Sequence, residues 1–250
     1  MESTGEQSGI ETFSKAVHSL ETQVIESQRE LLGEVAARMA KTVAGDGRIF
    51  VFGTGHSHML MEEGFYRAGG LPAVVMLSST ALMVHENPIL SGRLERMPGL
   101  ADSLLSRYNP QPDEMIFVFS NSGTNHLPVE MALLGHERGL GVVSVCSMAY
   151  ARVAPLSAIG KRLYEVADYA LDNGGQPGDA LVPVPGSDWR VGPSSTIINA
   201  LLWNCLVVET IWRLQRLGQE LPVIASLNMT GAAEHNEKLF AKWRKINPQL

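Results

Sequence analysis

The sequence predicts an α/β protein with three layers, in which helices cover both faces of a five-stranded parallel sheet. Three observations carry this prediction. Short apolar runs recur along the chain, and most are separated by segments of helical pattern. These runs are nearly continuous, which is typical of strands buried on both faces. Long amphipathic segments flank the set, as expected for the outer layers of a sandwich.

The segment from residue 10 to residue 44 is expected to be one long N-terminal helix. Its apolar residues recur at steps of three and four from Phe13 to Met39, which places them on one helix face, and Gly45 follows as a stop. A helix of about 30 residues is longer than a compact domain usually needs. We therefore expect its apolar face to pack against a second subunit as well as against its own core.

The five expected strands follow this helix. They are the apolar runs at 48–52, 72–77, 115–119, 141–146 and 167–171. Helical patterns lie between most of them, at 59–68, at 127–138 and in a short segment around 100–107, and further helices are expected at 195–217 and 232–246. The stretch 173–192 is rich in glycine and proline and is expected to be a long loop. The length and the lack of an internal repeat indicate a single domain over residues 1–250.

Composition and charge argue against several classes of partner. The net charge is −6 and the lysines and arginines are scattered, so we expect no nucleic-acid partner. Neither a basic start before an apolar run nor a stretch of about 18 apolar residues occurs, so we expect no signal peptide and no membrane span. The two cysteines, Cys146 and Cys205, lie in apolar runs and are expected to be buried thiols. Together these features predict a cytoplasmic protein.

Two of the expected strand ends carry clusters of small polar residues. "GTGHSH" occupies residues 53–58 and "SNSGTN" occupies residues 120–125, each between a strand and a helix. Ligands of open parallel sheets bind beyond the carboxyl ends of the strands, where helix N-termini offer free N–H groups to an anion. One cluster alone would fit ordinary helix capping, but two at neighbouring strand ends favour a phosphate site. The hydroxyl donors of this site would be Ser57, Ser120, Ser122 and Thr124.

Other common ligand motifs do not fit. A dinucleotide fingerprint requires glycine where His58 stands and an acid at the end of the second strand, where Ser78 stands. The chain has neither a GxxxxGK[ST] loop nor a GxSxG elbow. His56 and His58 are two residues apart at a helix start, so they face different directions, and no carboxylate or cysteine has matching spacing. We therefore expect no metal site and no cofactor.

The two clusters also carry a resemblance to a known family. "VFGTGHS" followed by "FVFSNSGTN" resembles the sugar isomerase (SIS) domain, and "GPSSTIINALLWNCLVVE", residues 192–209, resembles its third element. The segments "EEGFYRAGG", "MVHENPIL", "DNGGQPGDA" and "AEHNEKLF" are similar to an uncharacterised bacterial group of single-domain SIS proteins. The likeness covers nearly the whole chain from Ile10. SIS domains include isomerases, deaminating synthases, an etherase and non-catalytic sensors, so the likeness does not specify the reaction.

The resemblance implies a sugar phosphate as ligand and a homodimer or homotetramer as the assembly. It places the phosphate on the serine loop, the sugar against the first glycine-rich turn, and the start of the helix after the fifth strand beside them. The implied substrate- and phosphate-binding residues are Gly53, Gly55, Ser57, Ser120, Asn121, Ser122, Gly123, Thr124, Ser195 and Thr196.

The expected activity is isomerisation of a hexose or amino-sugar phosphate through an enediol, which needs a base that works near neutral pH. Heptose-phosphate isomerases place a catalytic histidine in the helix after the fifth strand, but the helix from Thr196 contains none. The expected proton-transfer groups are therefore Glu63, His85, Glu86 and His235. Two alternatives stay open at this point: a non-catalytic sugar-phosphate sensor, and a phosphosugar lyase, etherase or deaminase that uses glutamate as base.

Overall fold

The computed structural model describes residues 8–250 and confirms the α/β fold class. Its sheet is parallel and has five strands in the order β2-β1-β3-β4-β5. The strands are β1 Ile49–Gly53, β2 Val74–Met76, β3 Met115–Phe119, β4 Gly141–Cys146 and β5 Tyr169–Asp172. Ile49 of the interior strand β1 pairs with Val74 of β2 on one side and with Met115 of β3 on the other. Because the strands are parallel, their carboxyl ends all lie at the same end of the sheet.

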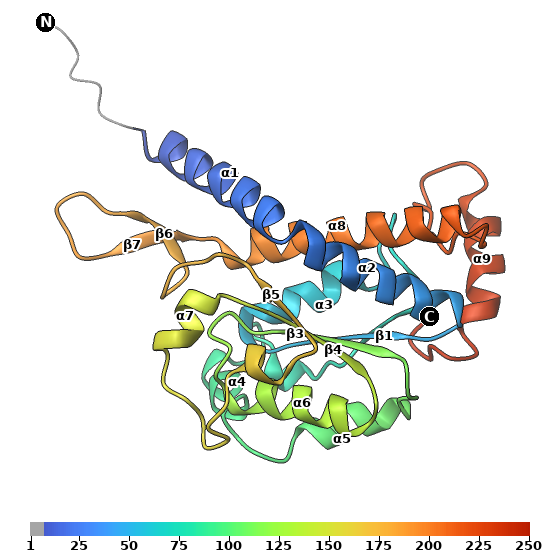
Figure 1. Cartoon of the computed structure of the whole chain (residues 1–250), viewed down its shortest axis with the longest axis horizontal. Helices are drawn as coiled ribbons and strands as arrows, with labels where there is room; N and C mark the ends of the chain where they lie inside the picture. Colours follow the sequence, from blue (N-terminus) through green and yellow to red (C-terminus); the bar gives the residue numbers. More distant parts are fainter. Residues whose placement is uncertain (1–7) are drawn as a thin grey trace, which may run out of the picture.

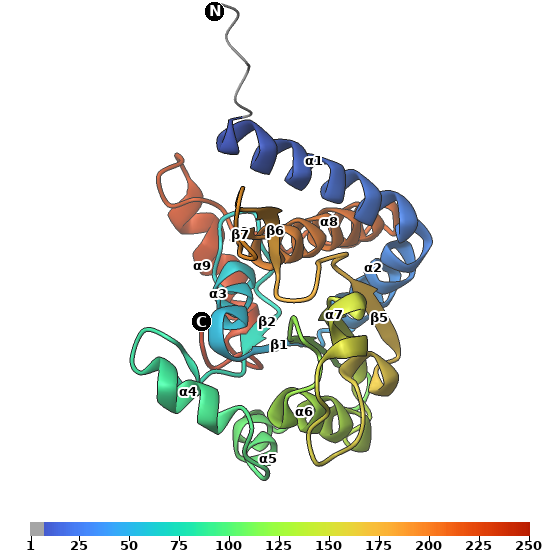
Figure 2. The ribbon, with the colours of Figure 1, turned by 90° about the vertical axis from the view of Figure 1, so that its left-hand side faces the viewer.

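Helices cover both faces of this sheet (Figure 2). The helices are α1 Gly9–Ser27, α2 Arg29–Ala44, α3 Met59–Gly64, α4 Pro88–Leu94, α5 Ala101–Leu105, α6 His126–Glu137, α7 Met148–Val153, α8 Ser195–Arg216 and α9 Ala232–Trp243. Successive residues of β1 alternate between the two faces, as strand geometry requires. Ile49 and Val51 join the core under α2 and α8, whereas Phe50 and Phe52 join the core under α5 and α6.

The predicted N-terminal helix is divided in two at Gln28 (Figure 1). Both atoms of the Gln28 side-chain amide pair with the backbone of Asp172 at the edge of the sheet. Nε2 donates to the Asp172 carbonyl at 2.6 Å, and Oε1 accepts from the Asp172 N–H at 2.7 Å. The amide therefore pairs with β5 at Asp172 as a neighbouring strand would, and Gln28 itself leaves helical geometry, with a φ of −121° and a ψ of 14°.

A second glutamine closes the opposite edge of the sheet. Gln249 Oε1 accepts from the N–H of Met76, and its Nε2 donates to the carbonyl of Met76, both at 2.8 Å. The buried Asn247 donates to the carbonyls of Pro72 and Val74 beside it. Unpaired edge strands are prone to pair with other chains, and here side-chain amides occupy both edges.

The stretch predicted as a long loop, 173–192, contains a β-hairpin instead. Strands β6 Ala180–Pro183 and β7 Arg190–Pro193 pair antiparallel and lie outside the main sheet. The hairpin projects beyond the layers beside the N-terminal part of α1 (Figure 1). The glycines and prolines of this stretch indicated a loop, and the two strands are too short to give an apolar run that would indicate otherwise.

Within residues 8–250, α8 is the one helix long and apolar enough to cross a membrane by length and composition. Its buried side chains include Ile198, Leu202 and Leu206, which belong to the main core. Trp203 meets Phe117 of β3 edge-on, with ring centroids 5.2 Å apart. In this fold α8 is a core helix that packs on the sheet.

Candidate functional site

A cavity of about 440 Å³ lies at the carboxyl ends of the central strands. The segments after β1 and β3 form much of it, as the sequence predicted. The loop after α4, the helix α7 and the segment before α8 close its sides. Its lining residues are Thr54, Gly55, His56, Ser57, Glu95, Arg96, Ser120, Asn121, Ser122, Thr124, Asn125, Tyr150, Ala154, Pro155, Asp179 and Ser195.

The serine loop that joins β3 to α6 depends on Gly123. Its φ is +60°, a left-handed conformation that favours glycine. A Cβ at this position would also lie 3.3 Å from the Cβ atoms of Ala151 and Cys146. The N–H of Gly123 donates to the carbonyl of Ser120 at 2.9 Å, which closes the turn. The loop is thus folded tightly onto the sheet end, with its polar side chains beside the cavity.

The hydroxyl donors of this loop and of the turn after β1 are uncommitted. Within residues 8–250, the hydroxyls of Ser57, Ser120, Ser122 and Thr124 make no hydrogen bond, although Ser120 and Thr124 are buried residues. Helix α6 starts directly after the loop and has no side-chain cap. Free hydroxyl donors beside a helix N-terminus suit an anion. In the first turn of α6 itself, the N–H of Leu127 donates to the Glu95 carbonyl and Pro128 has no N–H, so the hydroxyls are the main free donors. The loop therefore has the chemistry of an anion cradle.

A network of three asparagines holds the loop in place. Asn173, fully buried at the end of β5, donates to the side-chain oxygens of Asn121 at 2.9 Å and of Asn199 at 3.0 Å. The Asn121 carbonyl also accepts from the N–H of Ser147. Asn121 thus lines the cavity while Asn173 fixes its side chain and Ser147 fixes its backbone. In the sequence, the sign of this network is Asn199, a polar residue on the otherwise apolar buried face of α8.

The start of α8 is capped by a side chain that sequence reasoning missed. Asp179 accepts from the Ser195 hydroxyl at 2.7 Å, from the Ser195 N–H at 2.9 Å and from the Ser194 N–H at 3.2 Å. Its carboxylate therefore occupies the position where an anionic ligand would meet this helix end. Ser195 lines the cavity with its hydroxyl already bonded, and Thr196 is not among the lining residues.

The two glycines of the first turn have different roles. Gly55 lines the cavity and has a φ of +56°. Gly53 is not in the lining: a Cβ there would lie 2.4 Å from the carbonyl oxygen of Ser57. Gly53 lets the chain fold back on itself, and that fold brings Ser57 to the cavity.

The four expected proton-transfer groups do not line the cavity of this chain. Glu63 pairs with Arg67 and accepts a hydrogen bond from Asn204 of α8. His85 and Glu86 are exposed in the loop after β2. His235 lies on α9, where its Nε2 is 2.8 Å from the carbonyl oxygen of Val223. Their catalytic roles remain predictions, and the cavity gives them no support.

One carboxylate that the sequence did not single out does line the cavity. Glu95 follows α4, and its side chain is 15% exposed. Its Oε2 accepts from the Thr54 hydroxyl at 2.8 Å, and its Oε1 accepts from Arg96 Nη1 at 2.8 Å. No motif or periodicity marked this residue, because its position depends on contacts with β1 and α6.

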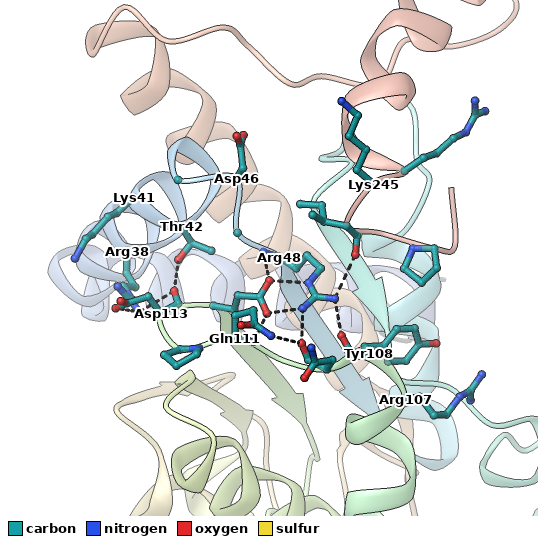
Figure 3. Close-up of a pocket in the computed structure, with 18 residues that line it drawn as sticks. Arg38, Lys41, Thr42, Asp46, Arg48, Arg107, Tyr108, Gln111, Asp113 and Lys245 are labelled. Carbon is teal, nitrogen blue, oxygen red and sulfur yellow. Dashed lines mark hydrogen bonds and ion pairs between the residues drawn. The ribbon is translucent and has the colours of Figure 1, made fainter.

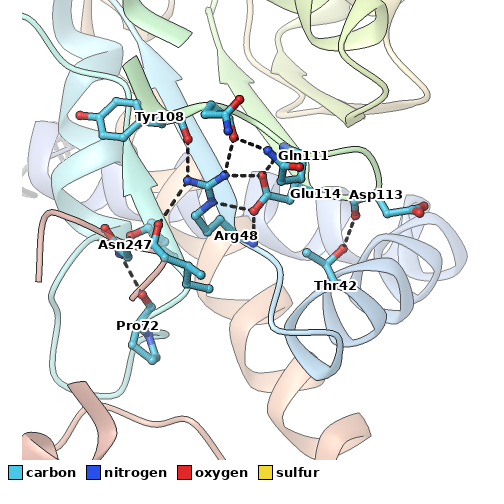
Figure 4. A network of polar contacts seen from close by, with 11 residues as sticks. Thr42, Arg48, Pro72, Tyr108, Gln111, Asp113, Glu114 and Asn247 are labelled. Carbon is cyan, nitrogen blue, oxygen red and sulfur yellow. Dashed lines mark hydrogen bonds and ion pairs between the residues drawn. The ribbon is translucent and has the colours of Figure 1, made fainter. Parts of the chain in front are cut away.

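A larger cavity of about 790 Å³ lies at the opposite end of the strands (Figure 3). Beside it, the buried Arg48 and Glu114 form an ion pair, with Arg48 Nε 2.6 Å from Glu114 Oε1 (Figure 4). The other guanidinium N–H groups donate to Glu114 and to the carbonyls of Tyr108, Asn109 and Ile246. Arg48 thus ties two loops and the C-terminal tail to β1. Its donors are all used, so this network is structural.

Comparison with known proteins extends the sequence resemblance. The family model for the SIS domain matches residues 12–147. A UPF0309 protein of Halalkalibacterium halodurans is 38% identical over 239 residues, which cover 95% of this chain and 99% of that protein. A UPF0309 protein of Brucella anthropi is 37% identical over 230 residues, which cover 88% of this chain and 93% of that protein.

Solved structures show the same fold at low sequence identity. A phosphoheptose isomerase from Francisella tularensis matches with a TM-score of 0.53 at 12% identity, covering 80% of this chain and 95% of that one. The Vibrio vulnificus NanR protein complexed with ManNAc-6P matches with a TM-score of 0.53 at 15% identity, covering 95% of this chain and 70% of that one. From the family match and the similarity to full-length relatives, the chain belongs to the SIS domain family and is a relative of the UPF0309 proteins.

Proposed function

We propose that this protein binds a hexose or amino-sugar phosphate in the cavity at the carboxyl ends of the strands and isomerises it through an enediol. The observation that carries the proposal is the serine loop. Ser120, Ser122 and Thr124 bring uncommitted hydroxyls to a cavity beside the start of α6, which has no side-chain cap. An anion that accepts these hydrogen bonds also meets the positive end of the helix dipole.

The comparisons support the proposal at the level of ligand class. The phosphoheptose isomerase and NanR share the fold, and the NanR structure holds ManNAc-6P.

A sensor is the second candidate, and one observation favours it. The four expected proton-transfer groups do not line the cavity. Among residues 8–250, the one histidine that does is His56, which is exposed. A protein that only reports a metabolite needs the phosphate cradle but no base. Turnover of a bound sugar phosphate by the wild-type protein distinguishes the isomerase hypothesis from the sensor hypothesis.

We also propose that the chain works in the cytoplasm as a homodimer or homotetramer. Its two thiols are free, as expected in a reducing compartment. Large apolar side chains are exposed on α1 and α8 and at the hairpin: Ile10 is 84% exposed, Trp212 57% and Trp189 77%. Contiguous apolar patches mark protein contacts, so the proposal requires these side chains to lie in a shared interface, and light scattering at micromolar concentration would measure the assembly.

The test of ligand class is a thermal-shift screen of glucose, fructose and glucosamine monophosphates, followed by titration. A compound present at about 100 times its Kd adds about 2.7 kcal/mol of stability. The double variant Ser122→Ala/Thr124→Ala should weaken binding by about 1–3 kcal/mol, since hydrogen bonds to a charged group are lost. A matched control, Ser226→Ala/Thr230→Ala in the loop before α9, should leave binding unchanged. Equal binding by both double variants would reject the serine loop as the phosphate site.

A further inference from the structure

Two carboxylates line the cavity within the described residues, Glu95 and Asp179. Asp179 is committed to the N-terminus of α8, where it accepts hydrogen bonds from the N–H groups and hydroxyls of Ser194 and Ser195. Glu95 accepts only two hydrogen bonds, one on each oxygen. A carboxylate has about four acceptor positions. Glu95 therefore keeps free capacity at the cavity, whereas Asp179 does not.

Glu95 is held in place from three elements. Its N–H donates to the carbonyl of Ser91, which ends α4, and its carbonyl accepts from the N–H of Leu127 at 3.0 Å. Leu127 belongs to the first turn of α6, the helix that follows the serine loop. The Thr54 hydroxyl at the end of β1 then fixes the carboxylate. The same two strand ends that form the cradle thus fix the position of Glu95.

We propose that Glu95 is the general base of this site and that the reaction is a 1,2 proton shift between an aldose phosphate and a ketose phosphate. The proposal rests on the proposed function. Among the described residues, Glu95 is the lining carboxylate that keeps acceptor positions free beside its bonds to Thr54 and Arg96. It suits this reaction, because one base can remove the proton from one carbon and return it to the next. Elimination of a substituent would begin with the same proton removal, so the product seen by NMR, a ketose phosphate or an unsaturated sugar phosphate, distinguishes the two reactions.

The step balances as follows. The ionised Glu95 takes the proton from the carbon next to the carbonyl, and the C–H electron pair becomes the C=C bond of the enediol. The carbonyl π pair takes a proton from water and becomes a hydroxyl. In the second half, the other enediol hydroxyl gives its proton back to the hydroxide that the first half left, and its O–H pair becomes the new carbonyl. The C=C pair takes the proton of Glu95 at the former carbonyl carbon. Glu95 is then ionised again.

Thr54 is assigned as a positioning residue, since it touches the base and orients it through a 2.8 Å hydrogen bond. Removal of its hydroxyl leaves Glu95 free to rotate, and a misplacement of about 1 Å can cost about 10²-fold in rate. Thr54→Ser keeps the hydroxyl, so it should keep turnover, whereas Thr54→Val should lower kcat with little change in KM.

The experiment compares full-length wild type, Glu95→Gln and the control Glu137→Gln, at the exposed far end of α6. Glucose, fructose and glucosamine monophosphates are the probes. For each protein, calorimetry measures the Kd, and NMR in D₂O measures turnover and exchange at the carbon next to the carbonyl. Glu95→Gln should bind like wild type within about threefold and lose turnover and exchange by about 10²- to 10⁴-fold. The control should match wild type.

The outcomes separate this inference from the proposed function. Full turnover in Glu95→Gln would overturn the assignment of Glu95 and leave the proposed isomerase intact, and a matching loss in Glu63→Gln or Glu86→Gln would move the base there. Binding without turnover or exchange in wild type would overturn the base and favour the sensor. If wild type binds none of the probes, the proposed function fails and the inference fails with it.

Discussion

Replacing Glu114 by glutamine should destabilise the fold strongly, although the change removes only one charge. Glu114 Oε1 accepts from the N–H and the Nε of Arg48, at 2.9 and 2.6 Å. Oε2 accepts from Arg48 Nη2 at 2.8 Å and from the N–H of Gln111 at 2.7 Å. A glutamine has one carbonyl oxygen, so either orientation loses two of these four hydrogen bonds.

The size of the effect follows from burial. The side chains of Arg48 and Glu114 are 7% and 6% exposed. Two lost hydrogen bonds to charged groups are worth about 1.5–3 kcal/mol each, and Arg48 becomes a buried charge without a counter-ion. We therefore expect a loss of about 3–5 kcal/mol in the free energy of unfolding, as for other buried pairs that lose one partner.

The neighbouring Asp113 provides a control with the same chemistry at the surface. It pairs with Arg38 at 3.3 Å, and its side chain is 82% exposed. Asp113→Asn should cost less than about 1 kcal/mol. Urea unfolding followed by circular dichroism measures both variants. A loss below about 1 kcal/mol for Glu114→Gln, or equal losses for the two variants, would refute the argument from burial.

Two further predictions follow from single side chains. Burial, with a smaller contribution from the charge of Asp172, raises the pKa of the Cys146 thiol to about 12. Cys146 should therefore stay unreactive toward a thiol reagent until the protein unfolds. Because the unfolded state loses this proton at lower pH than the folded state, the contribution of Cys146 to stability should fall as pH rises from about 9 to about 12, and Cys146→Ala should remove that slope. Gly53→Ala should abolish binding of the sugar phosphates, since its Cβ would lie 2.4 Å from the Ser57 carbonyl. The control Gly33→Ala on α2, whose Cβ would meet its nearest atom at 3.5 Å, should leave binding unchanged and stabilise the helix by about 0.5–1 kcal/mol. Equal binding by the two glycine variants would contradict the close-packed turn.

The parts of the fold that follow from local pattern were predictable. The buried strands appear in the sequence as continuous apolar runs, and residues of the polar clusters at 53–58 and 120–125 line one cavity at the carboxyl ends of the strands. The phosphate site predicted from these clusters stays a prediction. The break at Gln28 was not predictable, because glutamine suits a helix interior and the cause is a contact with Asp172, 144 residues away.

The polar groups around the cradle were also beyond local pattern. Glu95 lies between predicted elements in a segment without periodicity, and its role depends on Thr54 and on the first turn of α6. Asp179 lies just before a hairpin in a stretch whose glycines and prolines resemble a loop. Sequence pattern finds residues whose chemistry repeats locally, whereas these two carboxylates acquire their places only through tertiary contacts.

The most direct measurement of the central claim is a pair of calorimetric titrations on wild type, one with a sugar phosphate found by the screen and one with the same sugar without phosphate. If the serine loop is a phosphate cradle, the phosphorylated sugar should bind and the parent sugar should bind more weakly by at least the 1–3 kcal/mol that the loop's hydrogen bonds supply. The difference between the two titrations should shrink in Ser122→Ala/Thr124→Ala. Equal affinities for the two sugars, or an unchanged difference in the double variant, would contradict the claim.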